Sequence, residues 1–252
     1  MDILKRLITA LFLTTLFLQA ATRSDINAIE AAEKIRYLSQ KIAKDYLYLY
    51  SRPQRTDIKH NLEQMVERLG KSFATIAAST RDSDTKDLLE YLRYSQKGMR
   101  ELLQKPVTKQ TAAKMLDYSQ ILLEGAEWIV NTHSYRFSKE EAMLMNIKRY
   151  EYLLVRLGKL YMASRVEDLS QSNQQQIKDE LASLQKGLDT IQAYRYPASL
   201  ESLKKDLNLF RDANRHFLTH ANEMFVPGVL DITIGQFEQI LNQFALFHSK
   251  SQ

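Results

Sequence analysis

Apolar residues recur at helical spacing in the first quarter of the chain. Between residues 29 and 49, one stripe of apolar side chains follows three- and four-residue steps, which is typical of the core face of a bundle helix. A second stripe of mostly small residues runs beside it, interrupted by one arginine. A helix that buries two stripes must pack inside its own bundle and against another element. The first stripe is Ile35, Leu38, Ile42 and Leu49, and the second is Ile29, Ala32, Arg36, Ala43 and Leu47.

Turn and capping signals divide the 252 residues into eight predicted helices. The segment from Ser138 to Glu141 has the residues of a capping box, which is a strong start signal for the fifth helix. The chain has only four prolines and seven glycines, and no long stretch alternates apolar and polar residues, so an all-α protein is expected. The predicted breaks fall at 51–53, 79–83, 105–108, 131–137, 168–170, 196–197 and 226–228.

The two halves of the chain resemble each other at a nearly constant offset. Shifting the sequence by 115 positions places the apolar positions of the first helix on those of the fifth. The third and fourth helices match the seventh and eighth at the same offset, and the second helix slips by four. The sequence therefore predicts two tandem up-down four-helix bundles of long antiparallel helices, at 22–134 and 135–252. The equivalent first-helix pairs are Ile35 and Tyr150, Leu38 and Leu153, Ile42 and Leu157, and Tyr46 and Tyr161.

The N-terminal residues have the pattern of a secretory signal peptide. Lys5 and Arg6 form a positive head, an apolar run spans 7–18, and small residues follow at 19–21. The run is short for a transmembrane helix, which needs about 20 residues. We therefore expect residues 1–21 to be cleaved, and the mature protein to be periplasmic or secreted and not embedded in a membrane. The alternative is an uncleaved N-terminal anchor.

Composition excludes several classes of function. The absence of cysteine rules out disulfides, thiol catalysis and cysteine-ligated metals. The formal net charge of +5 is spread along the predicted helices, without the clusters that bind a nucleic-acid backbone. Nucleic acid is therefore not an expected partner.

Few residues suggest catalysis or metal binding. His216 and His220 share a helix face with Glu223 one turn further on, but the sequence between the histidines lacks the glutamate of a zinc-protease motif. The chain has no Glu-x-x-His pair, no glycine-rich phosphate loop and no nucleophile elbow. We predict no catalytic residues, no metal site and no cofactor.

Arg36 is the most informative polar residue of the first helix. A guanidinium within a stripe of small apolar residues is costly unless a partner pairs with it. Its planar array of donors suits a planar oxyanion. The alternative is an arginine that faces solvent at the edge of the core stripe.

The run from Ala32 to Leu47 resembles the first helix of the PilJ/NarX-type periplasmic sensor domains. In that family the run reads small, x, basic, x, Arg, apolar, Leu-Ser-Gln, basic, apolar, Ala-Lys, and the match covers about twenty residues. The resemblance implies that Arg36 holds a small anion such as nitrate at the axis of a dimer. It also implies that Lys34, Ser39 and Gln40 assist.

The second half departs from the first at this position. The equivalent of Arg36 is Glu151, so the second unit keeps an apolar seam without the arginine, unless Lys148 or Arg149 replaces it. If the two first helices pack together, Arg36 would lie near Glu151 and pair with it. The residues predicted to form the interface are Ala32, Ala43, Leu47, Glu151, Val155 and Gly158.

These observations favour a non-enzymatic, exported, sensor-like protein. It would bind a small ligand, with an anion such as nitrate as the first candidate, or present a helical surface to a membrane receptor or kinase. A homodimer is an open alternative for its assembly. The rival function is a purely structural helical interaction module that binds no small ligand.

Overall fold

The fold is that of a computed structural model, which describes residues 2–55, 57–133, 135–164, 166, 171–219 and 226–251, with side chains from residue 25 onward except at 171–174 and 213–219. The described residues form eight α-helices and no strand, so the predicted all-α class is confirmed. The helices are α1 (Asp2–Ser51), α2 (Asp57–Ser79), α3 (Ser83–Leu103), α4 (Lys109–Thr132), α5 (Lys139–Ala163), α6 (Gln171–Ala193), α7 (Ala198–Thr219) and α8 (Pro227–Lys250).

Local sequence signals explain where several helices begin. The capping box predicted before α5 is confirmed, because Ser138 and Glu141 each bond to the backbone of the other. Thr108 caps α4 in a similar reciprocal arrangement. Asp82 accepts a hydrogen bond from the backbone of Thr85 at the start of α3. These caps satisfy backbone donors that the first turn of a helix leaves free.

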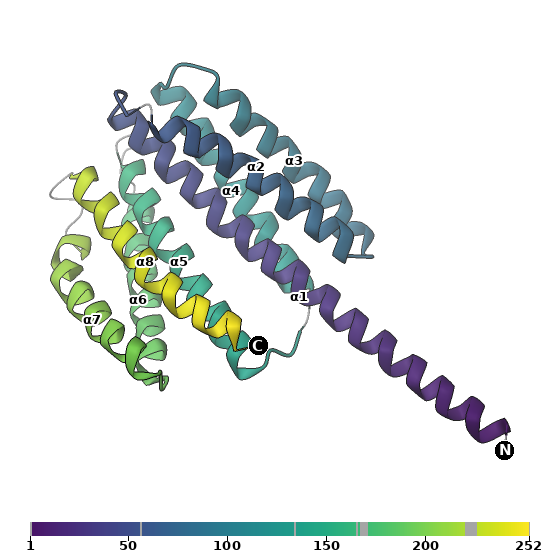
Figure 1. Ribbon diagram of the computed structural model, residues 1–252. Helices are drawn as coiled ribbons and strands as arrows, with labels where there is room; N and C mark the ends of the chain where they lie inside the picture. The colour runs from purple at the N-terminus through teal and green to yellow at the C-terminus, as the bar shows by residue number, and fades with distance from the viewer. Residues whose placement is uncertain are drawn as a thin grey trace.

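Helices α1 and α5 occupy the centre of the helical bundle (Figure 1). Helix α1 contacts α2, α4 and α5, and α5 also contacts α6 and α8. Helix α3 packs between α2 and α4, and α7 contacts α6 and α8. The two central helices run in the same direction, since contacts between them advance along both: Glu30 lies near Lys148, Arg36 near Tyr152 and Lys44 near Gly158.

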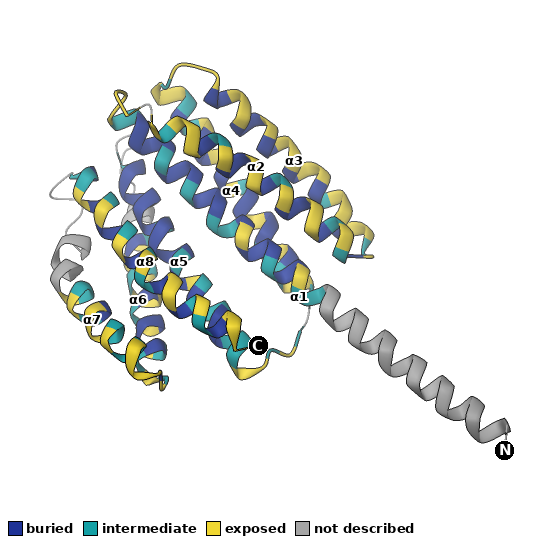
Figure 2. Ribbon diagram, viewed as in Figure 1, coloured by how far each residue is buried: buried dark blue, intermediate teal, exposed yellow. Residues whose placement is uncertain are grey.

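Both predicted stripes of the first helix are buried, except at Arg36. Of the core stripe, Ile35 and Ile42 are fully buried and Leu38 is 2% exposed. In the second stripe, Ala32 and Ala43 are fully buried. Figure 2 shows dark blue along the described part of α1 and along α5, in contrast to the yellow outer faces of α2 and α3. The two-stripe pattern thus correctly predicted a helix with neighbours on two faces.

The predicted signal peptide lies outside the residues whose side chains are described, so its cleavage stays a prediction. Within the described part of the chain, no helix is both long enough and apolar enough to span a membrane.

Candidate functional site

Arg36 is held by carboxylates of this chain. Its Nη1 donates to Glu33 Oε1 at 2.8 Å and its Nη2 to Glu127 Oε1 at 3.3 Å. The guanidinium also lies 4.6 Å from the centre of the Tyr152 ring. Burial lowers the pKa of Arg36, but Glu33, Tyr152 and Glu127 together more than offset this and raise the pKa above its ordinary value. Arg36 is therefore neither a solvent-facing side chain nor paired with Glu151.

Ser39 and Gln40 hold helices together. Both are fully buried. The Ser39 hydroxyl donates to the backbone oxygen of Arg36, and the Gln40 amide donates to Ser39 Oγ and to the backbone oxygen of Ser119 on α4. Their donors face the α1–α4 contact, which gives them a packing role in this structure.

The residues predicted for the interface lie on α1 and α5, the two helices that pack together. Val155 is fully buried. Gly158 permits a close approach, because a Cβ atom there would lie 2.9 Å from Cδ of Lys44 and would collide with Ile234 on α8. Ala32, Ala43 and Leu47 join the same apolar cluster as Val155.

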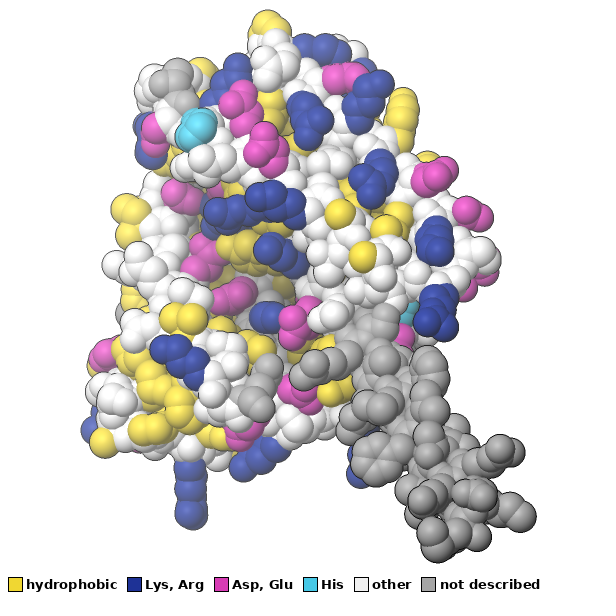
Figure 3. Space-filling model, turned by 45° about the vertical axis from the view of Figure 1, so that its right-hand side comes forward, with side chains coloured by type: hydrophobic (Ala, Val, Ile, Leu, Met, Phe, Trp, Pro, Cys, Tyr) yellow, Lys and Arg dark blue, Asp and Glu magenta, His cyan; other side chains and the backbone are white. Residues whose placement is uncertain are grey.

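A cavity of about 460 Å³ opens where α1, α2 and α5 meet. Figure 3 shows a hollowed strip of surface with Lys, Arg, Asp and Glu side chains around it. The volume falls within the range of small-molecule sites, about 300–1,000 Å³. Lys34, predicted from the sequence, lines this cavity, whereas Arg36, Ser39 and Gln40 do not. The lining residues are Asn27, Glu30, Ala31, Glu33, Lys34, Tyr37, Lys71, Ser72, Thr75, Lys148 and Glu151.

The inner wall of this cavity carries acceptors without donors. Glu33 is 8% exposed, and its Oε2 is buried without a hydrogen-bond partner. Among the described residues no hydrogen bond or ion pair involves Glu151. The two neighbouring hydroxyls are engaged elsewhere, since Tyr37 donates to Glu238 at 2.6 Å and Ser72 donates to the backbone oxygen of Arg68.

Burial raises the pKa of the Glu151 carboxyl from 4.5 to about 7, and the nearby carboxylate of Glu238 adds to the effect. Lys148 and Lys41 act in the opposite direction but do not offset the burial. At neutral pH the Glu151 carboxyl is therefore close to half ionised, and a cation bound beside it would favour the ionised form.

The outer part of the cavity is basic. Lys34 and Lys71 are exposed, and neither takes part in an ion pair among the described residues. Lys148 lies 3.8 Å from Glu30, a long and partly exposed contact that is weak in water. The cavity thus has the carboxylates of Glu33 and Glu151 inside, and three ammonium groups together with the Glu30 carboxylate at its mouth.

A second cavity of about 390 Å³ lies further along α1, between α2 and α8. Its charges pair with one another. Lys41 binds Glu238 at 2.8 Å, Lys44 binds Asp45 and Asp231, and Arg55 binds Asp57. The charged groups that face this second cavity are therefore largely satisfied, unlike those of the first.

The described residues include no group of three or more histidine, aspartate or glutamate side chains that could hold a metal ion. The side chain of His216, together with His220 and Glu223, lies outside the described residues.

Comparison of the chain with protein-family models, with curated proteins and with solved structures finds no match. The resemblance to the PilJ/NarX-type sensor domains therefore rests on the residues of the first helix alone.

Sequence reasoning missed most of the cavity, although one signal was present. Glu30, Glu33, Lys34 and Tyr37 follow the same three- and four-residue spacing as the apolar stripes and form a polar stripe on one face of α1. The sequence does not reveal which helix lies opposite that stripe. For the same reason, Lys71 of α2 carries no signal of its own.

Proposed function

We propose that this protein is a non-enzymatic, exported, sensor-like protein that binds a small charged ligand in the cavity between α1, α2 and α5. The observation that carries the proposal is a pair of carboxylates that line a ligand-sized cavity. Glu33 has a buried oxygen, Oε2, without a hydrogen-bond partner, and the half-buried Glu151 takes part in no hydrogen bond or ion pair among the described residues. Buried acceptors without donors are costly, and a ligand or ordered water that supplies donors removes that cost.

The proposed architecture is two tandem four-helix units, 22–134 and 135–252, which follow a signal peptide at 1–21. The helix contacts support it, since α1 to α4 contact one another in sequence order, α5 to α8 do the same, and α4 and α8 close back on α1 and α5. Each unit would then contribute one wall of the cavity.

The contact between the two units would follow an internal pseudo-two-fold axis. Tyr152 is the repeat equivalent of Tyr37, and Glu151 is that of Arg36. Arg36 lies against Tyr152, while Tyr37 and Glu151 line one cavity. A two-fold axis produces such a reciprocal arrangement, because each residue of one unit then lies near the equivalent of its own neighbour in the other unit. The pair α1 and α5 would take the place of the two first helices in a dimer of the family that the chain resembles.

In this proposal the ligand does not reach Arg36. The guanidinium already has two carboxylate partners, so an oxyanion would have to displace one of them. The groups available to a ligand are Glu33 and Glu151 inside the cavity and Lys34, Lys71 and Lys148 at its mouth. A receptor or kinase in the membrane would then bind the ligand-bound form of the protein.

Thermal unfolding with and without candidate ligands tests the proposal. A ligand that binds the native state raises the melting temperature, by an amount that grows with the logarithm of the ratio of its concentration to its Kd. We expect a rise with a small charged ligand that is lost in Glu151→Gln and kept in Glu67→Gln, an exposed glutamate of α2 outside the cavity. If no small charged molecule changes the melting temperature, the proposal is wrong.

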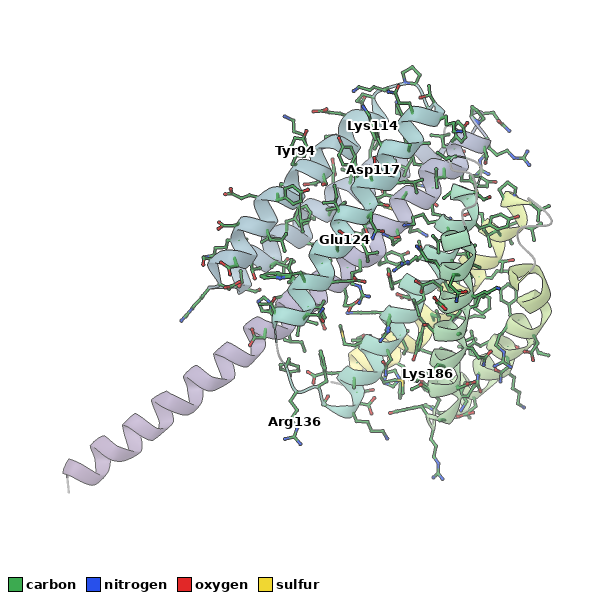
Figure 4. The ribbon with its side chains drawn as sticks, turned by 180° about the vertical axis from the view of Figure 1, so that it is seen from behind. Tyr94, Lys114, Asp117, Glu124, Arg136 and Lys186 are labelled. Carbon is green, nitrogen blue, oxygen red and sulfur yellow. The ribbon has the colours of Figure 1, made fainter. Side chains whose placement is uncertain are left out.

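The rival proposal, a structural interaction module, also has an observation in its favour. Tyr91, Tyr94 and Trp128 are 58%, 68% and 40% exposed on α3 and α4, on the far side of the bundle from the cavity mouth. Figure 4, seen from behind, labels Tyr94 on this outer surface. Exposed aromatic side chains are typical of protein contact surfaces. A protein partner that is lost in Trp128→Ser, with no small ligand found, would favour this rival.

A further inference from the structure

We propose that the ligand of the cavity is a small zwitterion of the amino-acid class, with its ammonium group on Glu33 and Glu151 and its carboxylate at the lysines of the mouth. The inference rests on the proposed function and gives the chemical class of the ligand. It is supported by the positions of the charged groups, since carboxylates lie inside the cavity and lysine ammonium groups lie at its mouth.

The inside of the cavity accepts hydrogen bonds and offers almost none. Glu33 Oε2 is buried without a donor. The half-buried carboxylate of Glu151 takes part in no hydrogen bond or ion pair among the described residues. The hydroxyls of Tyr37 and Ser72 donate to other groups. An ammonium group has three donors and no acceptor, so it matches such a surface. A carboxylate or nitrate placed there would meet like charge and unsatisfied acceptors.

Glu33 distinguishes this site from a surface cluster of acids. It is more than nine-tenths buried, and one of its two oxygens is already fixed by Arg36 at 2.8 Å. The second oxygen is thereby held in place with its lone pairs unused. A bound ammonium would complete a row of alternating charges that runs from Glu127 through Arg36 to Glu33 and the ligand.

The mouth of the cavity selects for a negative group on the same ligand. Lys34 and Lys71 belong to α1 and α2, and Lys148 belongs to α5, so ammonium groups approach from three helices. A ligand that carries only positive charge, such as a diamine, would be repelled there. A ligand that carries only negative charge would stop at the mouth. A molecule with both groups satisfies both ends.

The second cavity provides an internal contrast. Its lining has eight charged side chains against six in the first cavity. Of its four cations, Lys41, Lys44 and Arg55 each have a carboxylate partner within the wall, and only Arg68 has none among the described residues. A zwitterion there would have to break existing ion pairs. The preference of a zwitterion for the first cavity therefore follows from the unused groups and not from charge alone.

The test begins with calorimetric titration of the full-length protein against the proteinogenic L-amino acids and 4-aminobutyrate at pH 8. The tightest zwitterion is then compared with the amine and the carboxylate that each lack one of its charged groups. For 4-aminobutyrate these are butylamine and butyrate. Sodium nitrate is titrated in parallel as a planar anion.

We expect at least one zwitterion to bind at least tenfold more tightly than both single-charge counterparts. Glu151→Gln and Glu33→Gln should each weaken that binding tenfold or more, and Lys71→Gln should weaken it less. Glu67→Gln, which removes a carboxylate of α2 outside the cavity, should leave the affinity unchanged. Because Glu33→Gln also disturbs the Arg36 contact, Glu151→Gln decides the matter if the Glu33 variant does not fold.

Three results would overturn the inference. Equal affinity for the amine and the zwitterion would show that the lysines do not bind the ligand. Binding of nitrate or butyrate that depends on Lys34 and Lys71 but not on Glu151 would leave a ligand-binding protein with an anionic ligand, so the proposed function would survive alone. If none of these molecules binds, the zwitterion assignment is wrong, and failure of every other charged ligand in the melting experiment would remove the proposed function as well.

Discussion

The two sides of the contact between α1 and α5 have similar side chains and opposite outcomes. On the side that faces α4 and α6, Tyr152 accepts a hydrogen bond from Arg156 and lies against Arg36. On the side that faces α2 and α8, Tyr37 donates to Glu238, which also binds Lys41. The two sides differ at Arg36, whose repeat equivalent is Glu151. They also differ at its two partners, because the equivalents of Glu33 and Glu127 are Lys148 and Asn242.

These differences decide whether the charge at the position of Arg36 and Glu151 has an ion-pair partner. The Arg36 side chain is long enough to reach Glu33 and Glu127, so its charge forms ion pairs within the protein. The carboxylate of Glu151 is shorter, and it lies near Glu238 as well as near Lys148 and Lys41. It forms no ion pair among the described residues. One side is thus closed by its own ion pairs, while the other keeps a cavity with unused acceptors. The sequence predicted that Arg36 binds the ligand, and Arg36 lies on the side that ion pairs close.

The largest expected effect on stability concerns the apolar core of the bundle, which we call its frame and which both sides of the α1–α5 contact share. Leu38 and Leu153 occupy equivalent positions in the predicted repeat and are 2% and 5% exposed. Truncation of either side chain to alanine should cost about 2–5 kcal/mol of unfolding free energy. Chemical denaturation measures this, and a cost near zero for either variant would show that its half of the frame is not packed as described.

The next prediction compares Arg36 with Glu151 directly. Arg36→Met leaves Glu33 buried without its cation and should destabilise the protein by roughly 2–4 kcal/mol. Glu151→Gln removes a half-buried charge that has no ion-pair partner among the described residues, and should stabilise the protein at pH 8 by about 1–2 kcal/mol. Opposite signs at two equivalent positions are the expected result of paired denaturation curves. The same sign for both variants would remove the contrast between the two sides.

A pH dependence of stability follows from Glu151. Because its pKa is raised from 4.5 to about 7 in the folded protein, the native state binds more protons than the unfolded state between those values. This group therefore favours folding least above pH 7, and its contribution declines as the pH rises from about 4.5 to 7. The charged groups that face it are Glu238 on α8, Lys41 on α1 and Lys148 on α5.

Denaturation of the wild type and of Glu151→Gln across pH 4 to 9 isolates this contribution, because other titrating groups cancel in the difference. The stability gained by the variant should grow between pH 4.5 and 7 and then level off. A difference that is constant over the whole range would mean that Glu151 titrates at its ordinary value.

The smallest effect is expected at the mouth of the cavity. Lys34 is exposed and has no ion-pair partner among the described residues, so Lys34→Gln should change the unfolding free energy by no more than about 0.5 kcal/mol. The same variant should weaken binding of the ligand, since one ammonium group of the mouth is lost. A large loss of stability would show that the Lys34 ammonium group already has a partner within the free protein.

The sequence predicted the frame better than the site, for a physical reason. Apolar periodicity reports which face of a helix is buried, and it correctly gave two buried stripes on α1. The capping residues of α5 likewise depend only on neighbours in the chain. A cavity depends on which polar faces of distant helices meet, and α1, α2 and α5 meet through contacts that no local pattern encodes.

Arg36 illustrates the same limit at one residue. The prediction that a guanidinium in an apolar stripe needs a partner was sound. The partner it has on α4, Glu127, is distant in sequence, and the other, Glu33, is one turn away on the same helix. Nothing in the local sequence separated these carboxylates from an external anion. The resemblance to a sensor family favoured the anion.

The ionisation of Glu151 is the most direct test of an unpaired carboxylate at this contact. Nuclear magnetic resonance of protein labelled with ¹³C at the glutamate carboxyl carbon measures it, and Glu151→Gln assigns the signal by its absence. We expect Glu151 to titrate with a pKa of about 7 in the free protein, and the pKa to fall when an ammonium-bearing ligand occupies the cavity. A pKa near 4.5 in the free protein, unchanged by any ligand, would contradict the claim that this side of the α1–α5 contact holds an unpaired carboxylate that can bind a ligand.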